Sequence, residues 1–370
     1  MRTGNGPFSR TWQHASGILP LAAGVLLLAL LAACAGPTTP AAPTPTLGST
    51  VVPPTRLPAP TAAPTPTPRP LPAVYPLSGL PADPAYVRWP PLAVMVPSDS
   101  ASYALSQASV VYVAAVEGGI PRYMALFEQV QAEQVGPVRS ARPYFVEWAC
   151  PYGPLFIHWG GSPDALALLG TSECVRPLDG QTYGRSYYFE QEDPAVPWNN
   201  QFTSSDLLYS YLENWEIARP ADLPGYPHGP EGCAYIGFPA PLEITIPWDP
   251  VVRYTFYADV SSRWKRFLDG RPHLDALTGE QIAVDNLAIL FVPQQPIAGD
   301  PAGRLEFQTT GEGEAAVFVC GSQIAGRWVK ESPTSALRLL DEAGQEILLT
   351  PGSLWIEVLA PGQDLSIATP

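Results

Sequence analysis

The chain has few basic side chains for its length. Its 20 Lys and Arg residues stand against 34 Asp and Glu residues, a formal net charge of -14, and its only lysines are Lys265 and Lys330. Such a chain offers no basic stripe to a phosphate backbone, so we expect no nucleic-acid partner. An acidic protein is also repelled by anionic lipid, so membrane attachment would require a covalent anchor.

Metal-binding patterns are also missing. The sequence has no HExxH motif, no close histidine pair and no zinc-knuckle spacing of cysteines, so we expect no metal. No motif predicts a cofactor. Beyond Cys34 the cysteines are even in number, and the compartment predicted below is oxidising, which favours the pairs Cys150 with Cys174 and Cys233 with Cys320. Three connectivities are possible, and buried free thiols are an equal alternative.

Residues 1–34 have the pattern of a targeting segment. Arg2 and Arg10 form a basic start, an apolar run follows at 18–31, and the sequence Leu-Ala-Ala-Cys ends at Cys34. This is a lipobox, the cleavage signal of bacterial lipoproteins, and it predicts a lipid on Cys34. An uncleaved signal anchor is the alternative. Both place the protein on the extracytoplasmic face of the cell membrane.

Residues 35–74 are almost entirely Pro, Thr and Ala. This composition cannot bury enough apolar surface to fold, and prolines favour an extended polyproline II chain of about 3.1 Å per residue. We expect a disordered stalk that holds a globular body on the order of 100 Å from the lipid.

Residues 75–370 are more than a single hydrophobic core usually accommodates, so two domains are predicted. Strands and helices alternate over 75–239, which predicts an α/β (α+β) domain with a mixed sheet and flanking helices. From 240 to 370 the pattern changes to strands and turns, which predicts a smaller β-rich domain.

A glycine turn lies between two expected strands in the first domain. The apolar run Val110–Val116 ends at Glu117-Gly118-Gly119, a turn sequence, and the next apolar run is Tyr123–Phe127. Glu117 and Arg122 should therefore lie at the two shoulders of one turn.

Two further arginines follow at Arg139 and Arg142. If Ser140 caps a helix that runs to about Cys150, both arginines lie beside a helix end that is already positive. That arrangement needs an anion. Glu117, a ligand carboxylate and a phosphate are the candidates.

The run Leu155–Trp159 predicts a strand that carries His158 near its end. Ser162 followed by proline predicts a helix start. His158 and Ser162 should therefore flank the C-terminal end of a strand, where open α/β sheets bind ligands.

Several strings of this stretch resemble the YerB-like bacterial lipoproteins, a family known as a domain of unknown function: VYVAAVEGGIPRYMALFEQ, VGPVRSARPYF and IHWGGSPDAL. Later strings, such as AVFVCGSQIAGRWVK, are similar to the C-terminal part of that family. The resemblance implies a two-domain surface lipoprotein and supplies no reaction. The family's characteristic residues fall on Glu117, Gly118, Gly119, Arg122, Gly136, Pro137, Arg139, Ser140, Arg142, His158, Gly161 and Ser162. Pro121, Pro97-Ser98 and Trp198 depart from the family pattern, and Trp198 stands where a histidine is expected.

Two functions are compatible with these residues. The first is noncatalytic binding or scaffolding, in which the arginines hold an anionic group of peptidoglycan or of an envelope protein. The second is an envelope hydrolase with Glu117 or His158 as general base. Each candidate also has a structural alternative: Glu117 and the arginines could form a buried ion-pair network. His158 could be a satisfied strand-end residue, and Ser140 and Ser162 could be helix caps.

Overall fold

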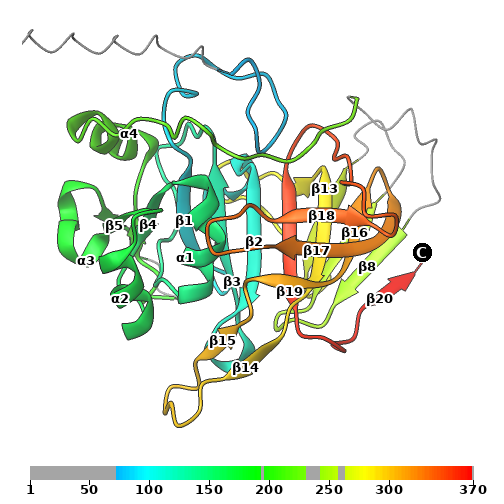
Figure 1. The fold of residues 1–370 in the computed structure, drawn as a ribbon. Helices are drawn as coiled ribbons and strands as arrows, with labels where there is room; N and C mark the ends of the chain where they lie inside the picture. The colour runs from blue at the N-terminus through cyan, green and yellow to red at the C-terminus, as the bar shows by residue number, and fades with distance from the viewer. Residues whose placement is uncertain (1–71, 193–195, 231–241, 257–262, 369–370) are drawn as a thin grey trace, which may run out of the picture. The chain divides into compact units, whose positions relative to one another are not determined.

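A mixed sheet of ten strands forms the centre of the fold (Figure 1). The computed structural model describes residues 72–192, 196–230, 242–256 and 263–368. In spatial order the strands are β18 (Arg338–Asp341), β17 (Ser322–Lys330), β16 (Gly311–Val319), β13 (Asn286–Phe291), β19 (Leu354–Leu359), β2 (Val110–Ala115), β3 (Pro121–Phe127), β1 (Leu92–Pro97), β4 (Leu155–His158) and β5 (Arg176–Asp179). The pairs β13–β19, β19–β2, β1–β4 and β4–β5 are parallel, and the other pairs are antiparallel. The predicted mixed sheet is therefore present.

Smaller sheets complete the strand inventory. A second sheet contains β11 (Arg271–Pro272), β10 (Trp264–Leu268), β9 (Val252–Phe256), β8 (Leu242–Ile246) and β20 (Ser366–Ala368), with β12 (Ala283–Val284) on β10. Two hairpin-like pairs are β14 (Gln294–Pro296) with β15 (Leu305–Phe307), and β6 (Phe189–Glu190) with β7 (Gln201–Phe202). The described part of the chain after residue 241 contains strands as its only regular elements.

The helices gather around β1, β4 and β5 (Figure 1). They are α1 (Pro143–Ala149), α2 (Pro163–Thr171), α3 (Gly180–Tyr183) and α4 (Ser205–Asn214). The described residues also form the short 3-10 turns η1 (Leu105–Gln107), η2 (Glu117–Gly119), η3 (Cys150–Tyr152) and η4 (Gly184–Ser186). Among the described residues, no helix combines the length and the apolar character needed to cross a membrane.

Both faces of the large sheet are covered, which explains its continuous apolar runs. Alternate residues of a strand point to opposite faces, and in β1 Leu92 and Val94 belong to one core cluster while Ala93 and Met95 belong to the other. The first cluster includes side chains of the second sheet and of α4, and the other includes those of α1 and α2. The large sheet is therefore the middle layer.

The predicted domain boundary at residues 239 and 240 lies outside the described residues, as do residues 1–71 with Cys34 and most of the predicted stalk. Strands from both sides of that boundary share the large sheet, because β19 pairs with β2 over Leu354–Glu357. The two parts of the chain are thus joined by backbone hydrogen bonds.

A buried charged pair connects the two sheets. Arg266 of β10 and Glu357 of β19 are both fully buried, and Arg266 Nη2 lies 3.7 Å from Glu357 Oε1. The hydroxyl of Tyr254 donates to Glu357 Oε1 (2.6 Å) and accepts from Arg266 Nε (3.0 Å). The indole of Trp248 donates to Glu357 Oε2 (2.7 Å). Burial of such a pair costs desolvation free energy that these hydrogen bonds offset.

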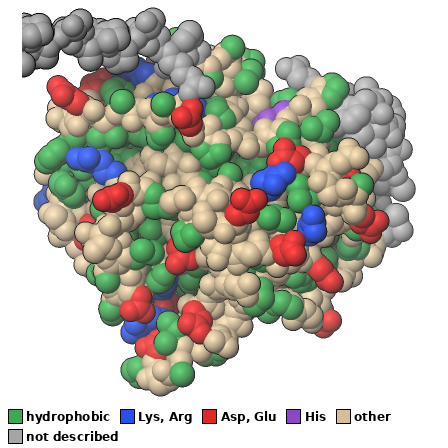
Figure 2. Space-filling model, in the orientation of Figure 1, with side chains coloured by type: hydrophobic (Ala, Val, Ile, Leu, Met, Phe, Trp, Pro, Cys, Tyr) green, Lys and Arg blue, Asp and Glu red, His purple; other side chains and the backbone are tan. Residues whose placement is uncertain are grey.

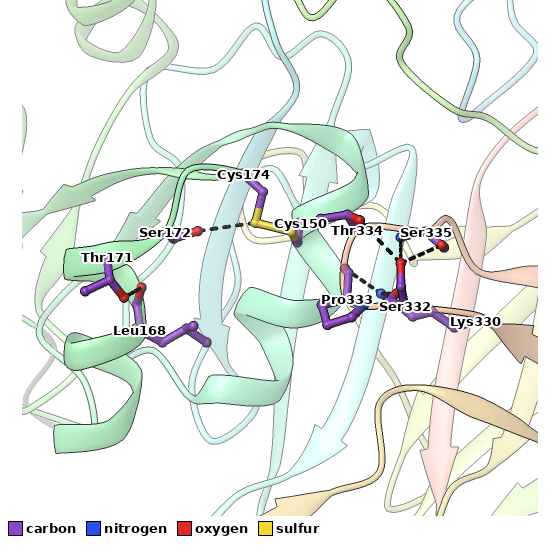
Figure 3. The surroundings of a disulfide bond; sticks show 10 residues. All are labelled: Cys150, Leu168, Thr171, Ser172, Cys174, Lys330, Ser332, Pro333, Thr334 and Ser335. Carbon is purple, nitrogen blue, oxygen red and sulfur yellow. Dashed lines mark hydrogen bonds between the residues drawn. A yellow bond between two sulfur atoms is a disulfide. The ribbon is translucent and has the colours of Figure 1, made fainter.

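One predicted disulfide, Cys150–Cys174, is present (Figure 3). It connects the end of α1 to the segment before β5, and the Oγ atom of Ser172 lies 3.2 Å from the Cys174 sulfur. The other predicted pair includes Cys233, which lies outside the described residues.

Removing the buried cation should strongly destabilise the protein. We expect Arg266→Met to lower the free energy of unfolding by about 3–5 kcal/mol, because Glu357 would remain buried without its cation. Urea unfolding followed by tryptophan fluorescence measures this change. Arg338→Met is the control, since Arg338 pairs with Glu346 at 2.7 Å on the surface, where ion pairs contribute little. Equal losses in the two variants would contradict the role given to Arg266.

Removing the disulfide should destabilise the protein less. We expect the double variant Cys150→Ser, Cys174→Ser to lose about 2–4 kcal/mol, because the crosslink restricts the unfolded chain between the two cysteines. Ser172→Ala, which removes only a neighbouring hydroxyl, should change the unfolding midpoint little. An unfolding midpoint of the double variant equal to that of the wild type would refute this expectation.

Candidate functional site

The predicted site residues lie along one edge of the large sheet. Four strands, β1, β2, β4 and β5, run in the same direction. Both β1 and β2 are antiparallel to β3. In turn, β4 is parallel to β1, and β5 is parallel to β4. Their C-terminal ends carry Asp99, Glu117, His158 and Asp179, and β3 begins at the same edge with Arg122 next to its start. This is the edge at which open α/β sheets bind ligands.

A short segment places the other two arginines at this edge. Residues 139–141 lie between β1 and β4 beyond the point where the two strands pair. Arg139 N donates to Met95 O (2.8 Å), Trp159 N donates to Arg139 O (3.0 Å), and Ala141 N donates to Gly160 O (3.0 Å). These backbone hydrogen bonds fix Arg139 and the following Arg142 beside Arg122.

Glu117 and Arg142 form a two-pronged ion pair. Arg142 Nε donates to Glu117 Oε1 (2.8 Å) and Arg142 Nη2 donates to Glu117 Oε2 (2.6 Å). Their side chains are 24% and 12% exposed, respectively. Burial alone would raise the pKa of Glu117, but the hydrogen bonds and charge of Arg142 outweigh it and hold that pKa below its ordinary value. Of the three expected anions, Glu117 therefore neutralises Arg142.

Arg122 is almost fully buried and has few hydrogen-bond partners. It is 8% exposed, its Nη1 donates to Ser140 O (3.2 Å), and its Nε has no acceptor among the described residues. Burial and the positive charges of Arg142 and Arg139 lower the pKa of Arg122 to about 10. An anion here would relieve both the desolvation and the repulsion.

Arg139 is held by groups that the sequence reasoning missed. Its Nη1 donates to Trp198 O (3.3 Å), and burial lowers the pKa of Arg139 while the negative charge of Asp99 opposes that effect. Asn199 donates to Asp99 Oδ1 (2.8 Å) and is 1% exposed. Asp99 and Asn199 directly follow Ser98 and Trp198, two positions that depart from the family pattern, and this adjacency is the sequence signal that would have found them.

The charges of this cluster do not balance. Three guanidinium groups, those of Arg122, Arg139 and Arg142, face two carboxylates, those of Glu117 and Asp99. Asp99 is exposed, so water screens it more than the buried groups. We call these five residues the arginine cluster.

His158 lies at the same edge but is sealed in the core. It is 1% exposed, and its Nδ1 lies 2.8 Å from Gly160 O and 3.8 Å from Asp179 Oδ1. Burial lowers the pKa of His158, which favours a neutral ring. Its Nε2 has no hydrogen-bond partner within the described ranges. This is the position of a strand-end histidine without access to solvent.

The two predicted helix caps had different outcomes. Ser162 caps α2, where its Oγ accepts from Ala165 N (3.3 Å), as predicted. The prediction for Ser140 was wrong: Arg142 is the N-cap residue of α1, and Ser140 Oγ donates to Trp159 O (3.0 Å). The physical reason is that residues 139–141 hydrogen-bond between β1 and the segment after β4, so the helix begins only after Arg142, whose backbone is extended.

The surroundings of the arginine cluster include exposed apolar side chains. Ile120 is 44% exposed and Trp198 is 56% exposed. On the face shown in Figure 2, acidic and basic side chains are interspersed. The residues that the structure describes contain no group of three or more His, Cys, Asp or Glu able to hold a metal ion.

Comparisons with known proteins confirm the predicted resemblance. The family model described as "Protein of unknown function (DUF3048) N-terminal domain" matches residues 77–218, and the corresponding C-terminal domain model matches residues 243–356. The chain is 28% identical over 302 residues to "Putative lipoprotein YerB" of Bacillus subtilis (strain 168), covering 76% of this chain and 85% of that protein. The crystal structure of the YerB protein from Bacillus subtilis is similar with a TM-score of 0.69 and 25% identity, covering 80% of this chain and 99% of that chain. The arginine cluster lies within the N-terminal match.

The ion pair of Glu117 predicts a pH-dependent contribution to stability. Because its folded-state pKa is lowered, its contribution is fully present above the unfolded pKa of about 4.3 and is lost as the pH falls through the folded pKa. We expect Glu117→Gln to cost about 1–2 kcal/mol at pH 7, and the difference from wild type to shrink as the pH falls below about 4. Urea unfolding of both proteins across this range is the measurement. A difference that stays constant with pH would contradict the assignment.

Proposed function

This chain belongs to the DUF3048 family, and from that premise we propose that it is a lipid-anchored extracytoplasmic protein that binds an anionic group of the cell envelope. The binding groups are the guanidinium groups of Arg122, Arg139 and Arg142. Ser140 and Ser162 help to position the segment that carries Arg139 and Arg142, because Ser140 Oγ donates to Trp159 O and Ser162 N donates to Ala141 O. The anchor is a lipid on Cys34. The role is binding or scaffolding, without a chemical step.

The incomplete pairing of Arg122 carries the proposal. This guanidinium is buried, repelled by two like charges, and leaves Nε without an acceptor in the described residues. A buried donor without an acceptor costs about 1–3 kcal/mol, more for a charged group. A ligand anion at the edge of the cluster would offset the repulsion that Arg139 and Arg142 exert on Arg122, which favours binding of an anion.

The position of the cluster supports binding as well. It lies at the C-terminal ends of β1, β2 and β4, and its members Arg139 and Arg142 are only partly buried. Arginine forks match carboxylates and phosphates through paired N–H groups. Peptidoglycan supplies carboxylates through its peptides, and envelope proteins supply them through acidic side chains and C-termini. These are the two ligand sources we propose.

The lipid anchor has independent support from the relatives. The Bacillus subtilis relative carries the word lipoprotein in its name, and this chain has a lipobox ending at Cys34. A proline-rich segment between that cysteine and the folded residues would allow the arginine cluster to reach ligands well away from the bilayer.

The alternative function, an envelope hydrolase, has less support. A general base needs a free acceptor within reach of a substrate proton. Both oxygens of Glu117 accept from Arg142, and its pKa is lowered. His158 is buried and hydrogen-bonded to its own turn. A general base must be accessible to the substrate and free to accept a proton. Glu117 is occupied by Arg142, and His158 is not accessible.

Loss of two arginines should weaken capture of the ligand. The full-length chain is immobilised and exposed to cell-wall fragments and to solubilised envelope proteins. We expect Arg139→Ala with Arg142→Ala to reduce capture by about 10-fold to 100-fold, since one charged hydrogen bond contributes about 1.5–3 kcal/mol. Arg338→Ala, which removes the same charge from an exposed pair, should capture like the wild type.

Folding of the variants must be measured in parallel, because Arg142→Ala also breaks the ion pair with Glu117. Arg139→Ala alone leaves that pair intact and should still reduce capture. Undiminished capture by a folded double variant would reject the arginine cluster as the binding site. Loss of folding in Arg139→Ala itself would favour a purely structural cluster.

A further inference from the structure

We infer that the anion is the free C-terminal carboxylate of a peptide and that it replaces the carboxylate of Glu117 on Arg142. Glu117 is then an internal competitor that occupies the site when the ligand is absent. This inference rests on the proposed function and specifies its ligand class and its regulation.

The geometry of Arg142 already accommodates a carboxylate. Its Nε and Nη2 atoms each donate to a different oxygen of Glu117, at 2.8 and 2.6 Å, which is the paired arrangement of an arginine with a planar carboxylate. A third donor, Nη1, is engaged by Ala141 O at 2.7 Å, so the fork is held in place by the backbone. A ligand carboxylate that replaced Glu117 would find the same donors in the same positions.

The local backbone allows Glu117 to leave. It begins η2, in which Gly118 and Gly119 have φ values of 74° and 76°, a conformation that glycine adopts without strain. A Cβ atom at either glycine would meet no described atom within 4 Å, so the turn is not packed against its neighbours. The Glu117 side chain can therefore swing outward without opening the core.

Two buried carboxylates of the described residues lack this freedom. Glu128 is 4% exposed and accepts from Leu77 N (2.9 Å) and Ser78 N (3.0 Å), which fixes it to the backbone. Glu357 is fully buried between the two sheets. Glu117 alone among these three carboxylates is placed on a surface turn of glycines, which is the arrangement that a displaceable group requires.

The neighbouring side chains favour a peptide terminus over an inorganic anion. Ile120, at the end of the same turn, and Trp198, whose carbonyl accepts from Arg139, are both largely exposed. A peptide C-terminus combines a carboxylate with an adjacent apolar side chain and carbonyl acceptors. It can contact the apolar residues while its oxygen atoms accept from Arg142 and Arg139.

The competition has a measurable consequence. Occupation of Arg142 by Glu117 lowers the apparent affinity by the fraction of molecules in which Arg142 is free. Glutamine at position 117 lacks the charge that makes the internal pair strong, so Glu117→Gln should bind the ligand about tenfold more tightly than the wild type. The substitution would thus reduce stability and increase affinity together.

Calorimetric titration of the full-length chain tests the inference with N-acetyl-Ala-Ala as the free acid, its C-terminal amide, and inorganic phosphate. We expect the free acid to bind Glu117→Gln about tenfold more tightly than wild type, and the amide and phosphate to bind neither protein measurably. The control is Glu213→Gln, which removes the same charge from an exposed pair with Arg88 and should bind like the wild type. Glu117→Asp, one methylene shorter, gives a second variant and should bind with intermediate affinity.

Two results overturn the inference while leaving the proposed function intact. One is equal or weaker binding of the free acid to folded Glu117→Gln and Glu117→Asp, with Arg139→Ala still losing capture of cell-wall fragments. The other is tighter binding of phosphate than of the free acid. If wild type and Arg139→Ala capture envelope fragments equally, the proposed function itself fails.

Discussion

The rest of the structure depends on the pairing of strand β19 with its two neighbours. It lies between β13 and β2 and pairs in parallel with both, so one backbone ladder makes a single sheet from the two parts that the family models treat separately. The strand also carries Glu357 toward the second sheet, where Arg266, Tyr254 and Trp248 surround its carboxylate. The six residues of β19 therefore supply both the backbone hydrogen bonds that join the large sheet and the buried charge that connects it to the second sheet.

The arginine cluster follows from the same sheet. Parallel neighbours bring strand ends to one edge, and the segment 139–141 inserts there between β1 and β4. This insertion brings the charge of Arg142 close to that of Arg122, and Glu117 neutralises only part of the total. The site therefore combines a rigid backbone framework with one carboxylate on a glycine turn. The proposed binding function uses the rigid part to fix the guanidinium groups and the turn to admit a ligand.

Local features of this fold could be predicted from the sequence, and long-range ones could not. The strands on either side of Glu117-Gly118-Gly119 are apolar runs bounded by turn residues, and Ser162 followed by proline is a cap that depends only on its neighbours. The pairing of Glu117 with Arg142 depends on where residues 139–141 insert, and the contact of Asp99 with Asn199 joins loops far apart in the chain. The helix cap was wrongly assigned to Ser140 because the insertion of residues 139–141 delays the start of the helix until after Arg142. Strand β5, with the sequence Arg-Pro-Leu-Asp, has no apolar alternation to indicate it.

The position of β19 far downstream of β2 in the chain sets an order of events during synthesis. The chain is made from its N-terminus, so β2 and its neighbour β3 emerge early. The other neighbour of β2 is β19, which cannot pair until residues 354–359 have emerged. Until then β2 exposes an unpaired strand edge, the kind of edge that pairs with other chains. The chain must therefore avoid such contacts until β19 is available to pair with β2.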